Sequence, residues 1–433
     1  MREPLESSTT LERQLAEAPA PAAAAARTAR ALRALFIIRD SFPSPRPDVL
    51  VLFGKRLPER GIRSDVVATG VPKTADAVSR WPAGSEFVND DGAGTLKRLL
   101  GALRLDLQML RHAEPYDAIV VRDKILTAWL ALRLCDPARV FFWMSYPFPE
   151  DDLVRSRIAL TGRLHRTALR VRGWLTGRLL YRGVVPRAAH VFVQSEHMRA
   201  AVARRSGRAG GMTAIPMGVD EALLAGHDAT LRIRPQPGEP LRLVYLGSLD
   251  RSRHIGFLLE VLQRLHAAQP GRFHLTLVGG ASTAEEYAAV QAQVRQMALD
   301  ELVRMTGQVS RDEAWAECAR CHIGLSAIPR GELFDVSSPT KAVEYLAMGL
   351  PVVVNDIPDQ AYLIEHSRAG LCAPMDVARF AAAIEQARDD YPRLAERALQ
   401  ARRWVIAERG YDRLADTVAQ VLAETLPEDP PAG

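Results

Sequence analysis

Short apolar runs alternate with amphipathic stretches along most of the chain from residue 34 onward. In the first half, runs rich in β-branched and aromatic residues predict buried strands at 34–38, 65–69, 118–121, 139–143 and 190–194. A helical pattern over 48–60 separates the first two runs, and helical stretches follow the later ones. Buried strands that alternate with helices are typical of a parallel sheet with crossover helices.

The same alternation begins again after residue 240. It predicts strands at 241–247, 274–280, 303–307, 323–328 and 351–355. It predicts helices at 255–268, 283–298, 311–319 and 340–348, and two closing helices at about 376–388 and 391–425. The predicted fold class is therefore α/β, with two Rossmann-like units that each hold a doubly wound parallel sheet.

Breaks in this pattern predict the domain boundaries. The first 20 residues hold more glutamates than arginines, and prolines interrupt the alanine run that follows, so we expect 1–30 to be a disordered leader rather than an export signal. Residues 225–240 are rich in Pro, Gly and polar residues, which predicts a linker. It separates a first domain, 31–224, from a second domain, 241–407.

Composition limits the class of protein. Of the 433 residues, 48% are apolar, which supports full-sized cores and excludes a wholly disordered chain or a small disulfide scaffold. No apolar run reaches the roughly 18 residues that span a bilayer. Four cysteines without an export signal favour the reducing cytoplasm, and we expect peripheral association with the inner face of the membrane.

The net charge of +5 conceals a strong asymmetry along the chain. Residues 1–220 hold 34 basic and 22 acidic residues, whereas residues 221–433 hold 22 basic and 29 acidic residues. Between Asp152 and Glu196 nine arginines occur without a single acidic residue. We therefore expect the first half to face an anionic partner.

The segment 155–187 has the pattern of a basic amphipathic helix. Its apolar positions share one helical face: Leu160, Leu164, Ala168, Val171, Leu175 and Leu179. Arg163, Arg166 and Arg170 lie on another face, with Trp174 near the boundary. We expect this helix to lie on an anionic membrane surface, although an apolar stripe packed in the core would give the same pattern. Nucleic acid would attract the same charge, but no reading helix or aromatic-interleaved sheet supports it as a partner.

The start of the helix predicted at 340–348 offers the clearest candidate chemistry. Pro339 and Thr340 open this helix beyond the carboxyl edge of a sheet, where doubly wound folds bind phosphates on free N–H groups. Lys341 in the first turn is unfavourable beside the helix dipole unless a bound diphosphate compensates it. Glu344, one turn further, is suited to accept hydrogen bonds from vicinal hydroxyls. An ordinary helix with a solvated lysine and glutamate is the alternative.

Five short motifs follow one another along the chain. They are IPMGVD at 215–220, LVYLGSLDRSRHIGFLLEVL at 243–262, HLTLVGG at 274–280, VRMTG at 303–307 and PTKAVEYLAMGLPVVV at 339–354. Their combination in this order resembles the retaining GT-B glycosyltransferases of family 4. The resemblance implies two Rossmann-like domains that face a cleft, and a last helix, within 408–433, that crosses back to the first domain.

One glutamate of a family motif is kept and the other is lost. Glu344 matches the second glutamate of the family's Glu-x7-Glu motif, which holds the donor ribose. The first glutamate falls on Val336. Asp335 or Glu332 is the candidate to supply a carboxylate to the donor sugar instead.

The phosphate-binding residues that the resemblance implies also differ in part. The family's Arg and Lys after the first glycine strand fall on Ser248 and Arg253, so one cation is lost and one is kept. We expect Arg251 and Lys341 to replace the lost charge. Arg253, Lys341 and Glu344 are thus the expected catalytic residues. Donor binding is expected from Gly247, Ser248, Arg251, Gly307, Asp335, Ser338 and Thr340.

No metal ion is expected to be needed. None of the 26 aspartates lies two residues from another, so the Asp-x-Asp metal motif of the other major transferase fold is absent. The spacing of Cys318, Cys321 and His322 resembles a zinc or redox motif, but a zinc site needs about four ligands. Small buried residues where a helix meets a strand are the simpler interpretation.

The resemblance implies transfer of a hexose-type sugar, with retention, from a nucleotide diphosphate donor such as a UDP- or GDP-sugar. The expected acceptor is a membrane-associated, lipid-linked or polysaccharide glycan in cell-envelope or exopolysaccharide biosynthesis. It would meet the first half, where loops follow strands at 39–47, Arg122–Lys124 and Ser145–Pro147. The alternatives are a GT-B nucleotide-sugar epimerase and a non-catalytic GT-B-like membrane scaffold.

Overall fold

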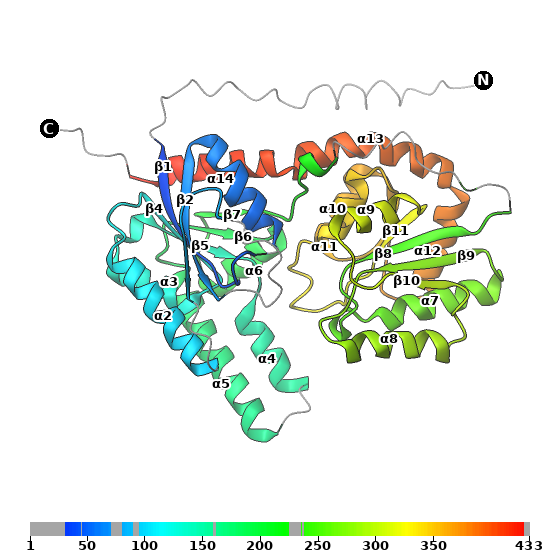
Figure 1. Ribbon diagram of the computed structural model, residues 1–433, viewed down its shortest axis with the longest axis horizontal. Coiled ribbons are helices and arrows are strands. Elements are labelled where there is room, and N and C mark those ends of the chain that lie inside the picture. The colour runs from blue at the N-terminus through cyan, green and yellow to red at the C-terminus, as the bar shows by residue number, and fades with distance from the viewer. Residues whose placement is uncertain are drawn as a thin grey trace.

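The protein forms two lobes, each built around a parallel β-sheet (Figure 1). The computed structural model describes residues 31–44, 46–70, 80–89, 95–158, 162–224, 235 and 238–427. The predicted leader, most of the predicted linker and Leu160 lie outside these residues. The two sheets confirm the predicted α/β class with two doubly wound units.

The first sheet has seven strands whose hydrogen-bonded neighbours all run parallel. In spatial order they are β3 (Glu86–Asn89), β2 (Ile62–Thr69), β1 (Leu32–Ile37), β4 (Ala118–Arg122), β5 (Val140–Met144), β6 (His190–Val193) and β7 (Met212–Ala214). Alternate residues of the buried strand β1 enter different cores, since Phe36 packs on one face of the sheet and Leu35 on the other. Both faces of this sheet are therefore covered.

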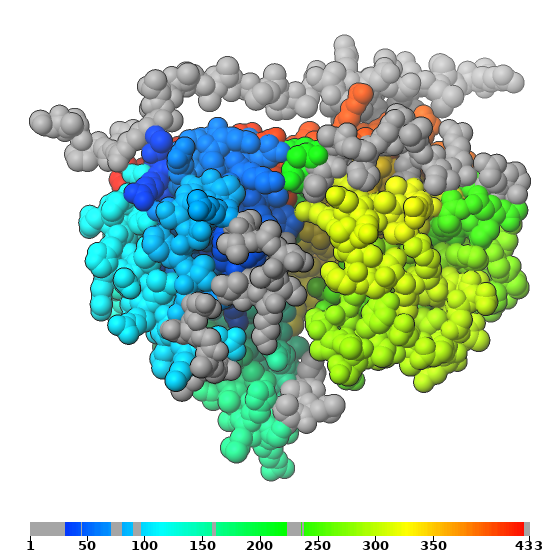
Figure 2. All heavy atoms as spheres, viewed as in Figure 1, coloured from blue at the N-terminus to red at the C-terminus, as the bar shows by residue number. Residues whose placement is uncertain are grey.

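Helical segments cover the two faces of the first sheet. They are η1 (Asp48–Arg56), η2 (Pro58–Arg60), α2 (Thr95–Arg111), α3 (Ile125–Leu134), η3 (Pro137–Arg139), α4 (Phe148–Ile158), α5 (Arg163–Leu179), η4 (Leu180–Val184), α6 (Glu196–Ser206) and η5 (Glu221–Leu224). The stretch predicted as one helix at 48–60 is a π-helix, η1, followed by a short 3₁₀ turn, η2. Helices α4 and α5 pack against each other and project from the lobe as an arm, which we call the α4–α5 arm (Figures 1 and 2).

The second sheet has six parallel strands. In spatial order they are β10 (Val303–Met305), β9 (Phe273–Val278), β8 (Leu241–Leu246), β11 (Ile323–Ser326), β12 (Val352–Asn355) and β13 (Gly370–Ala373). Its helical segments are η7 (Arg251–Arg253), α7 (Ile255–Ala268), α8 (Ala284–Gln296), α9 (Arg311–Ala319), α10 (Thr340–Ala347), α11 (Pro358–Ser367) and α12 (Val377–Asp389). The periodicity predicted α7 and α9 with the observed bounds. It did not predict the short strands β3, β7 and β13.

The prediction of one long helix over 391–425 is wrong, because the chain forms α13 (Tyr391–Arg409) and α14 (Tyr411–Thr425) with a break at Gly410. The backbone of Gly410 is extended and bridges to Val219, the residue that precedes the first lobe's last turn. The amide of Val219 donates to the carbonyl of Arg409 at 2.9 Å, and the amide of Tyr411 donates back to Val219 at 3.1 Å. A Cβ at position 410 would lie 2.5 Å from the carbonyl oxygen of Ile406 and would also meet the carboxylate of Glu221, so the close crossing favours glycine.

After this break, α14 packs on the first lobe, and α13 runs over the second (Figure 1). Apolar side chains of α14 belong to the same buried cluster as Phe36 and Leu52 of the first lobe; they are Tyr411, Leu414, Ala415, Val418 and Leu422. The last helix thus completes the core of the first lobe although it follows the second lobe in sequence. The boundaries of the predicted domains stay a prediction.

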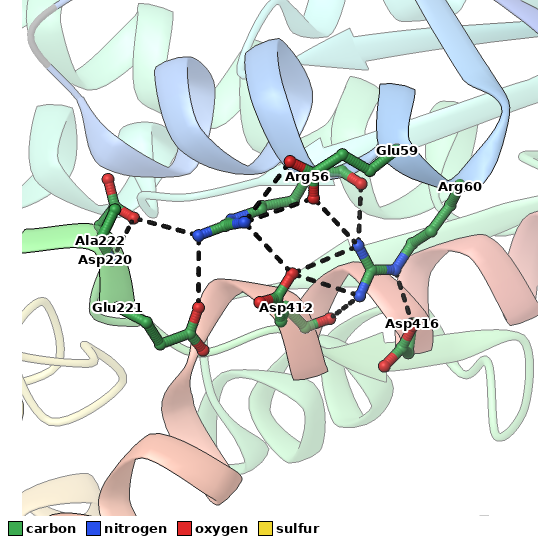
Figure 3. A network of polar contacts seen from close by, with 8 residues as sticks. All are labelled: Arg56, Glu59, Arg60, Asp220, Glu221, Ala222, Asp412 and Asp416. Atoms are coloured by element: carbon green, nitrogen blue, oxygen red, sulfur yellow. Dashed lines mark hydrogen bonds and ion pairs between the residues drawn. The ribbon is translucent and has the colours of Figure 1, made fainter. Parts of the chain in front are cut away.

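A network of charged side chains surrounds this crossing (Figure 3). Arg56 lies between Asp220 at 3.4 Å, Glu221 at 3.5 Å and Asp412 at 3.6 Å, while Arg60 pairs with Asp416 at 2.7 Å. Burial and the neighbouring carboxyl of Asp412 raise the pKa of Glu221 to about 7. The network joins η1 and η2 to Asp220 and Glu221, which lie just before the predicted linker, and to α14.

The loop before α10 connects the two lobes at the carboxyl ends of their sheets. Val336 packs into the core of the first lobe, and its carbonyl accepts a hydrogen bond from the hydroxyl of Ser195 at 2.7 Å. Glu332 in the same loop pairs with Arg205 at 3.7 Å. Residue 336 therefore serves as an apolar contact between the lobes, which explains physically why a carboxylate is absent there. No helix within the described ranges is long and apolar enough to cross a bilayer.

Candidate functional site

A cavity of about 400 Å³, which we call the donor-side cavity because residues expected to bind the donor lie around it, opens where β8, β9 and β10 end. Three glycines allow the backbone to come together here: Gly247 (φ 142°), Gly279 (φ 134°) and Gly307 (φ 70°). A Cβ on Gly279 would overlap the carbonyl of Gly247, and Gly279 bridges to Gly307. Since only glycine adopts these conformations readily, part of the cavity wall is backbone without side chains, which a ligand can approach closely.

Helix α10 begins at the edge of this cavity. Thr340 is its first residue, and the preceding Pro339 has no side chain that caps the exposed N–H groups. The Lys341 side chain lies against Gly247, where a Cβ would come within 2.9 Å of its Cε atom. The ammonium of Lys341 also sits 4.9 Å from the ring centre of Tyr245. The helix start and one cation thus face the same glycine turn.

Two cations, Lys341 and Arg253, lie close enough at this position to act on each other, and Glu344 and Asp250 are carboxylates near them. Burial, followed by the nearby guanidinium of Arg253, lowers the pKa of Lys341 to about 8, and Glu344 opposes that shift only as the smaller cause. Arg253 donates from Nε to the hydroxyl of Ser248 at 3.3 Å. Such an arrangement is electrostatically unfavourable in isolation and would be relieved by an anion.

Glu344 is largely buried behind Lys341. Burial raises the pKa of its carboxyl, and the positive charge of Arg311 limits the increase. The two side chains form an ion pair of 3.5 Å between Arg311 Nη2 and Glu344 Oε1. The carboxylate is therefore held by a cation from α9.

The structure brings together most of the residues expected to act on the donor. Gly247, Ser248, Arg253, Lys341 and Glu344 gather around the glycine turn and the first turn of α10. The role of each of them stays a prediction.

Other expected residues are engaged elsewhere. The amide of Arg251 donates to Glu286 at 3.2 Å, and its exposed side chain lines a separate cavity beside α8. Asp335 forms an ion pair with Arg330 at 2.7 Å, which holds the pKa of Asp335 below its usual range against the effect of burial. Asp335 therefore faces a cation of its own loop.

Ser338 takes part in a buried network between the lobes. Its hydroxyl donates to Asp359 at 2.8 Å and accepts from the amide of Met217 at 3.0 Å. Arg409 closes the network with a bond of 2.8 Å to Asp359. The hydroxyl of Ser338 is thus already used, and Thr340 is the nearer of the two to the open start of α10.

Sequence reasoning missed several residues that line the donor-side cavity. Gly279 and Gly280 follow β9 directly, and a glycine pair at a strand end is a signal that could have been used. Gln308 follows Gly307 into the same wall. Arg311 carries no local signal, because its relation to Glu344 arises only when α9 packs beside α10.

The carboxyl edge of the first sheet holds a second group of charges. Arg122 is fully buried and pairs with Asp40 at 2.5 Å and Asp48 at 2.7 Å. Asp123, whose φ is 59°, accepts hydrogen bonds from the amide and hydroxyl of Ser145. Lys124 pairs with Asp106 at 2.7 Å. The charges that the sequence placed at this edge are therefore largely neutralised within the lobe.

The α4–α5 arm exposes the apolar stripe that the sequence predicted. On α5, Leu169 and Gly173 face inward. Leu164 is 89% exposed, and the other large apolar side chains in water are Val171, Trp174 and Leu175. The alternative, in which this stripe packs in the core, is thereby wrong, because the buried residues of α5 are Leu169 and Gly173 instead.

The cysteine motif has a structural explanation. Cys318 and Cys321 are buried in the second lobe, and His322 accepts a hydrogen bond from the amide of Arg242 at 2.9 Å. Among the residues described, no group of three or more His, Cys, Asp or Glu side chains could hold a metal ion.

Two family models match most of the chain. Residues 49–223 match a model described as Glycosyltransferase Family 4, and residues 240–390 match one described as Glycosyl transferases group 1. Together with the two facing Rossmann-like lobes, these matches show that the chain belongs to the group 1 glycosyltransferases of the GT-B fold.

Individual relatives agree with this family. Glycogen synthase of Mycobacterium tuberculosis is 27% identical over 190 residues, 43% of either chain. The amylovoran biosynthesis glycosyltransferase AmsK of Erwinia amylovora is 27% identical over 159 residues, 36% of this chain and 37% of AmsK. The chain thus spans less than half the length of the curated relatives it matches. The structure of HepE from Anabaena in complex with UDP and glucose has a TM-score of 0.68 and 19% identity, and the match covers 91% of this chain and all of HepE.

Proposed function

We propose that the protein transfers a hexose-type sugar, with retention, from a UDP- or GDP-sugar to a membrane-associated glycan acceptor. The observation that supports this most directly is the glycine-walled cavity with Lys341, Arg253 and the uncapped start of α10 at its edge. The solved relative HepE holds UDP and glucose, which fits a nucleotide-sugar donor. Polysaccharide synthesis by curated relatives fits a role in cell-envelope or exopolysaccharide biosynthesis.

The chemistry of sugar transfer fits the charges at this cavity. When the glycosidic bond to the donor diphosphate breaks, negative charge develops on the departing phosphate. Lys341, Arg253 and the N–H groups of α10 supply fixed positive charge and donors at that place. Glu344 would accept hydrogen bonds from the donor ribose. Because these groups already stabilise a leaving diphosphate, the proposed reaction needs no divalent cation.

The acceptor is assigned to the first lobe, at a membrane. The exposed stripe of Leu164, Val171 and Leu175 on α5 lies beside exposed arginines, which suits insertion at the interface of an anionic bilayer. None of the four cysteines, all within the described ranges, forms a disulfide, in keeping with the reducing cytoplasm. We therefore propose that the enzyme works from the cytoplasm at the inner face of the membrane.

The first experiment identifies the donor. Thermal shifts are measured with UDP, GDP, ADP and their sugars, and the donor found is then supplied with a radiolabelled sugar to protein mixed with anionic vesicles that carry a bacterial lipid extract. We expect label in the lipid or glycan fraction and an unchanged anomeric configuration by NMR. Isomerised or hydrolysed donor without transfer would indicate the epimerase, and no stabilisation by any nucleotide would indicate the scaffold.

The second experiment concerns metal ions. We expect transfer to continue in excess EDTA, because cations of the protein take the place of a metal. Transfer that stops in EDTA and returns with magnesium or manganese would contradict the proposed electrostatic role of Lys341 and Arg253.

A further inference from the structure

A cavity of about 680 Å³ opens in the first lobe between α2, α3 and the α4–α5 arm. Its floor is the carboxyl edge of the first sheet, where Arg39 follows β1 and Lys124 follows β4. Its apolar wall includes Leu99 and Leu100 of α2 and Leu126 of α3, all of which are exposed. Apolar side chains over a charged floor form an amphiphilic cavity of the size of a ligand site.

The charges in this cavity do not cancel. Asp106 is neutralised by Lys124, and Asp152 accepts two hydrogen bonds from Arg172. Asp123 accepts hydrogen bonds from Ser145 and pairs with Arg122 at 3.6 Å. Arg39 and Arg98 also line the cavity, and neither has a carboxylate within 4 Å among the described side chains. Two cations are thus left to meet an anion at the apolar wall.

A row of side chains leads from this cavity toward the other lobe. The guanidinium of Arg39 stacks on the ring of Phe148 at 3.8 Å, and Phe148 packs edge to face against Tyr146 at 5.0 Å. Burial raises the pKa of Tyr146 to about 12, and the charge of Arg253 in the second lobe opposes that increase. Arg253 therefore lies close enough to Tyr146 to act on it electrostatically. The first lobe's cavity is adjacent to the place where the donor diphosphate would be held.

We propose that this cavity binds the acceptor, and that the acceptor is an amphiphile with a phosphate where its hydrocarbon chain meets its polar head. The hydrocarbon lies along Leu99, Leu100 and Leu126, and the phosphate meets Arg39 and Arg98. This inference rests on the proposed function, whose acceptor class it narrows. A glycan without a lipid would leave the leucine wall in water and the two arginines without an anion.

The arrangement also connects the cavity to the membrane surface. Arg172 and Thr176 of α5 line the cavity, whereas Val171 and Leu175, next to them on the same helix, are exposed on its outer side. One helix therefore forms the wall of the cavity and carries the apolar stripe. The proposed lipid chain would therefore enter the cavity beside the same helix that is proposed to meet the bilayer.

The test uses a soluble probe, dodecyl phosphate, below its micelle concentration and without vesicles. Binding to the full chain is measured by calorimetry and compared with dodecyl maltoside, which has the same chain and a neutral head, with inorganic phosphate and with maltoheptaose. We expect a single site for dodecyl phosphate, at least tenfold tighter than for any of the other three. Equal binding of dodecyl maltoside, or preferential binding of maltoheptaose, would overturn the proposal.

Matched variants locate the site. Leu126 and Leu134 both lie on α3 and are 47% and 49% exposed, but only Leu126 lines the cavity. We expect Leu126→Gln to weaken the binding of dodecyl phosphate about fivefold, since it removes part of an apolar contact, and Leu134→Gln to leave it unchanged. Equal effects of the two changes would overturn the proposed wall.

The cation is tested in the same way. We expect Arg39→Gln to weaken binding by about tenfold or more, whereas the exposed Arg63→Gln, on β2 and away from the cavity, has no effect. If Arg39→Gln disturbs its packing on Phe148, Arg98→Gln on α2 tests the same charge without that contact. Binding that survives the loss of both arginines would overturn the phosphate position.

Two further arms separate this site from its alternatives. Replacement of Arg163, Arg170 and Arg178 by Gln on the outer faces of α5 should leave binding of dodecyl phosphate unchanged, and a large loss would assign the probe to the membrane surface instead. Stabilisation by the nucleotide is measured on every variant. In the unchanged protein, nucleotide binding without dodecyl phosphate binding would overturn the acceptor site alone, whereas dodecyl phosphate binding without any nucleotide binding would overturn the proposed donor function.

Discussion

The two lobes carry their positive charge in opposite ways. In the second lobe, Lys341 and Arg253 are half-buried beside a cavity walled by glycine backbone, and their proximity lowers the pKa of Lys341. In the first lobe, the arginines of α5 stand in water beside an exposed apolar stripe. The first arrangement concentrates charge at one point, and the second spreads it along a helix.

This difference determines how each lobe can hold a phosphate. A buried cation acts through a low dielectric and is weakly screened by salt, so one residue can carry much of the affinity. An exposed cation near an anionic bilayer contributes about 1 kcal/mol and loses this contribution as salt increases. Affinity should therefore be specific and salt-tolerant in the second lobe, but additive and salt-sensitive on the arm.

The arm offers the largest expected effect. Replacement of Arg163, Arg170 and Arg178 by Gln should weaken binding to anionic vesicles by roughly 3 kcal/mol, over a hundredfold, because three cations leave the membrane surface. The sequence pattern pointed to Arg166 as the third residue, but this side chain is half-buried, whereas Arg178 is exposed. Sedimentation with anionic and with neutral vesicles measures the change.

Replacement of the same three arginines by lysine keeps the charge and is the matched control. It should bind vesicles nearly as well as the original protein, and 0.5 M salt should weaken both alike. Nucleotide binding in the other lobe should not change. Equal binding to neutral and anionic vesicles would remove the electrostatic role of α5.

The next effect concerns a single carboxylate of the second lobe. Glu344→Ala should weaken donor binding by about 1.5–3 kcal/mol, ten- to a hundredfold, since a charged hydrogen bond to the ribose is lost. Calorimetry with the donor measures it, and circular dichroism shows that the variant is folded. The exposed Glu365 on α11 is the control, and Glu365→Ala should bind the donor normally. Unchanged affinity in Glu344→Ala would exclude this residue from the site.

The pH dependence of nucleotide binding sharpens the comparison further. A bound diphosphate favours the charged form of Lys341, so its pKa must be higher in the complex than the value of about 8 in the free protein. Affinity for UDP or GDP should be steady at pH 7 and fall by up to about tenfold per pH unit above pH 8. Lys341→Arg, which stays charged, should flatten this profile. A flat profile for the original protein between pH 7 and 9.5 would contradict the role of Lys341.

The smallest effect is expected at the crossing in Figure 3. Glu221 has a pKa of about 7 in the folded chain, above its ordinary value of 4.5, so its ionised form is disfavoured by folding. This costs stability progressively as pH increases from about 4.5 to 7, and the cost stays constant above pH 7. Glu221→Gln should therefore stabilise the protein by about 1–2 kcal/mol at pH 8 and by little at pH 4.5. Thermal unfolding at both pH values measures this, and stabilisation that is equal at both would contradict it.

The periodicity of the sequence was sufficient for the fold where elements are long and amphipathic. Helices α7 and α9 were predicted with their observed bounds, and both sheets were predicted as parallel. The short strands β3 (EFVN) and β13 (GLCA) were missed because neither holds the run of large apolar residues that marked the equally short β6 (HVFV) and β12 (VVVN). The break at Gly410 was missed because its cause is the approach of Val219, nearly two hundred residues earlier.

The donor-side cavity could be predicted in part, because Lys341 and Glu344 stand on the same helix and Gly247 ends a strand. The residues that neutralise or perturb the charges of Lys341 and Glu344 could not be predicted. Arg311 forms an ion pair with Glu344 from a separate helix, and the hydroxyl of Ser338 is hydrogen-bonded to Asp359 and to the amide of Met217. Contacts of this kind depend on packing between elements, for which a single sequence carries no periodic signal.

The position of α14 has a consequence for the synthesis of the chain. Leu414, Val418 and Leu422 cover apolar residues of the first lobe, yet they are translated after the whole of the second lobe. The second lobe's elements, up to α13, are complete before that moment, although the first lobe was translated earlier. Phe36 and its neighbours therefore stay partly uncovered until α14 has been synthesised. Docking of α14 then buries a surface that is prone to aggregation in the nascent protein.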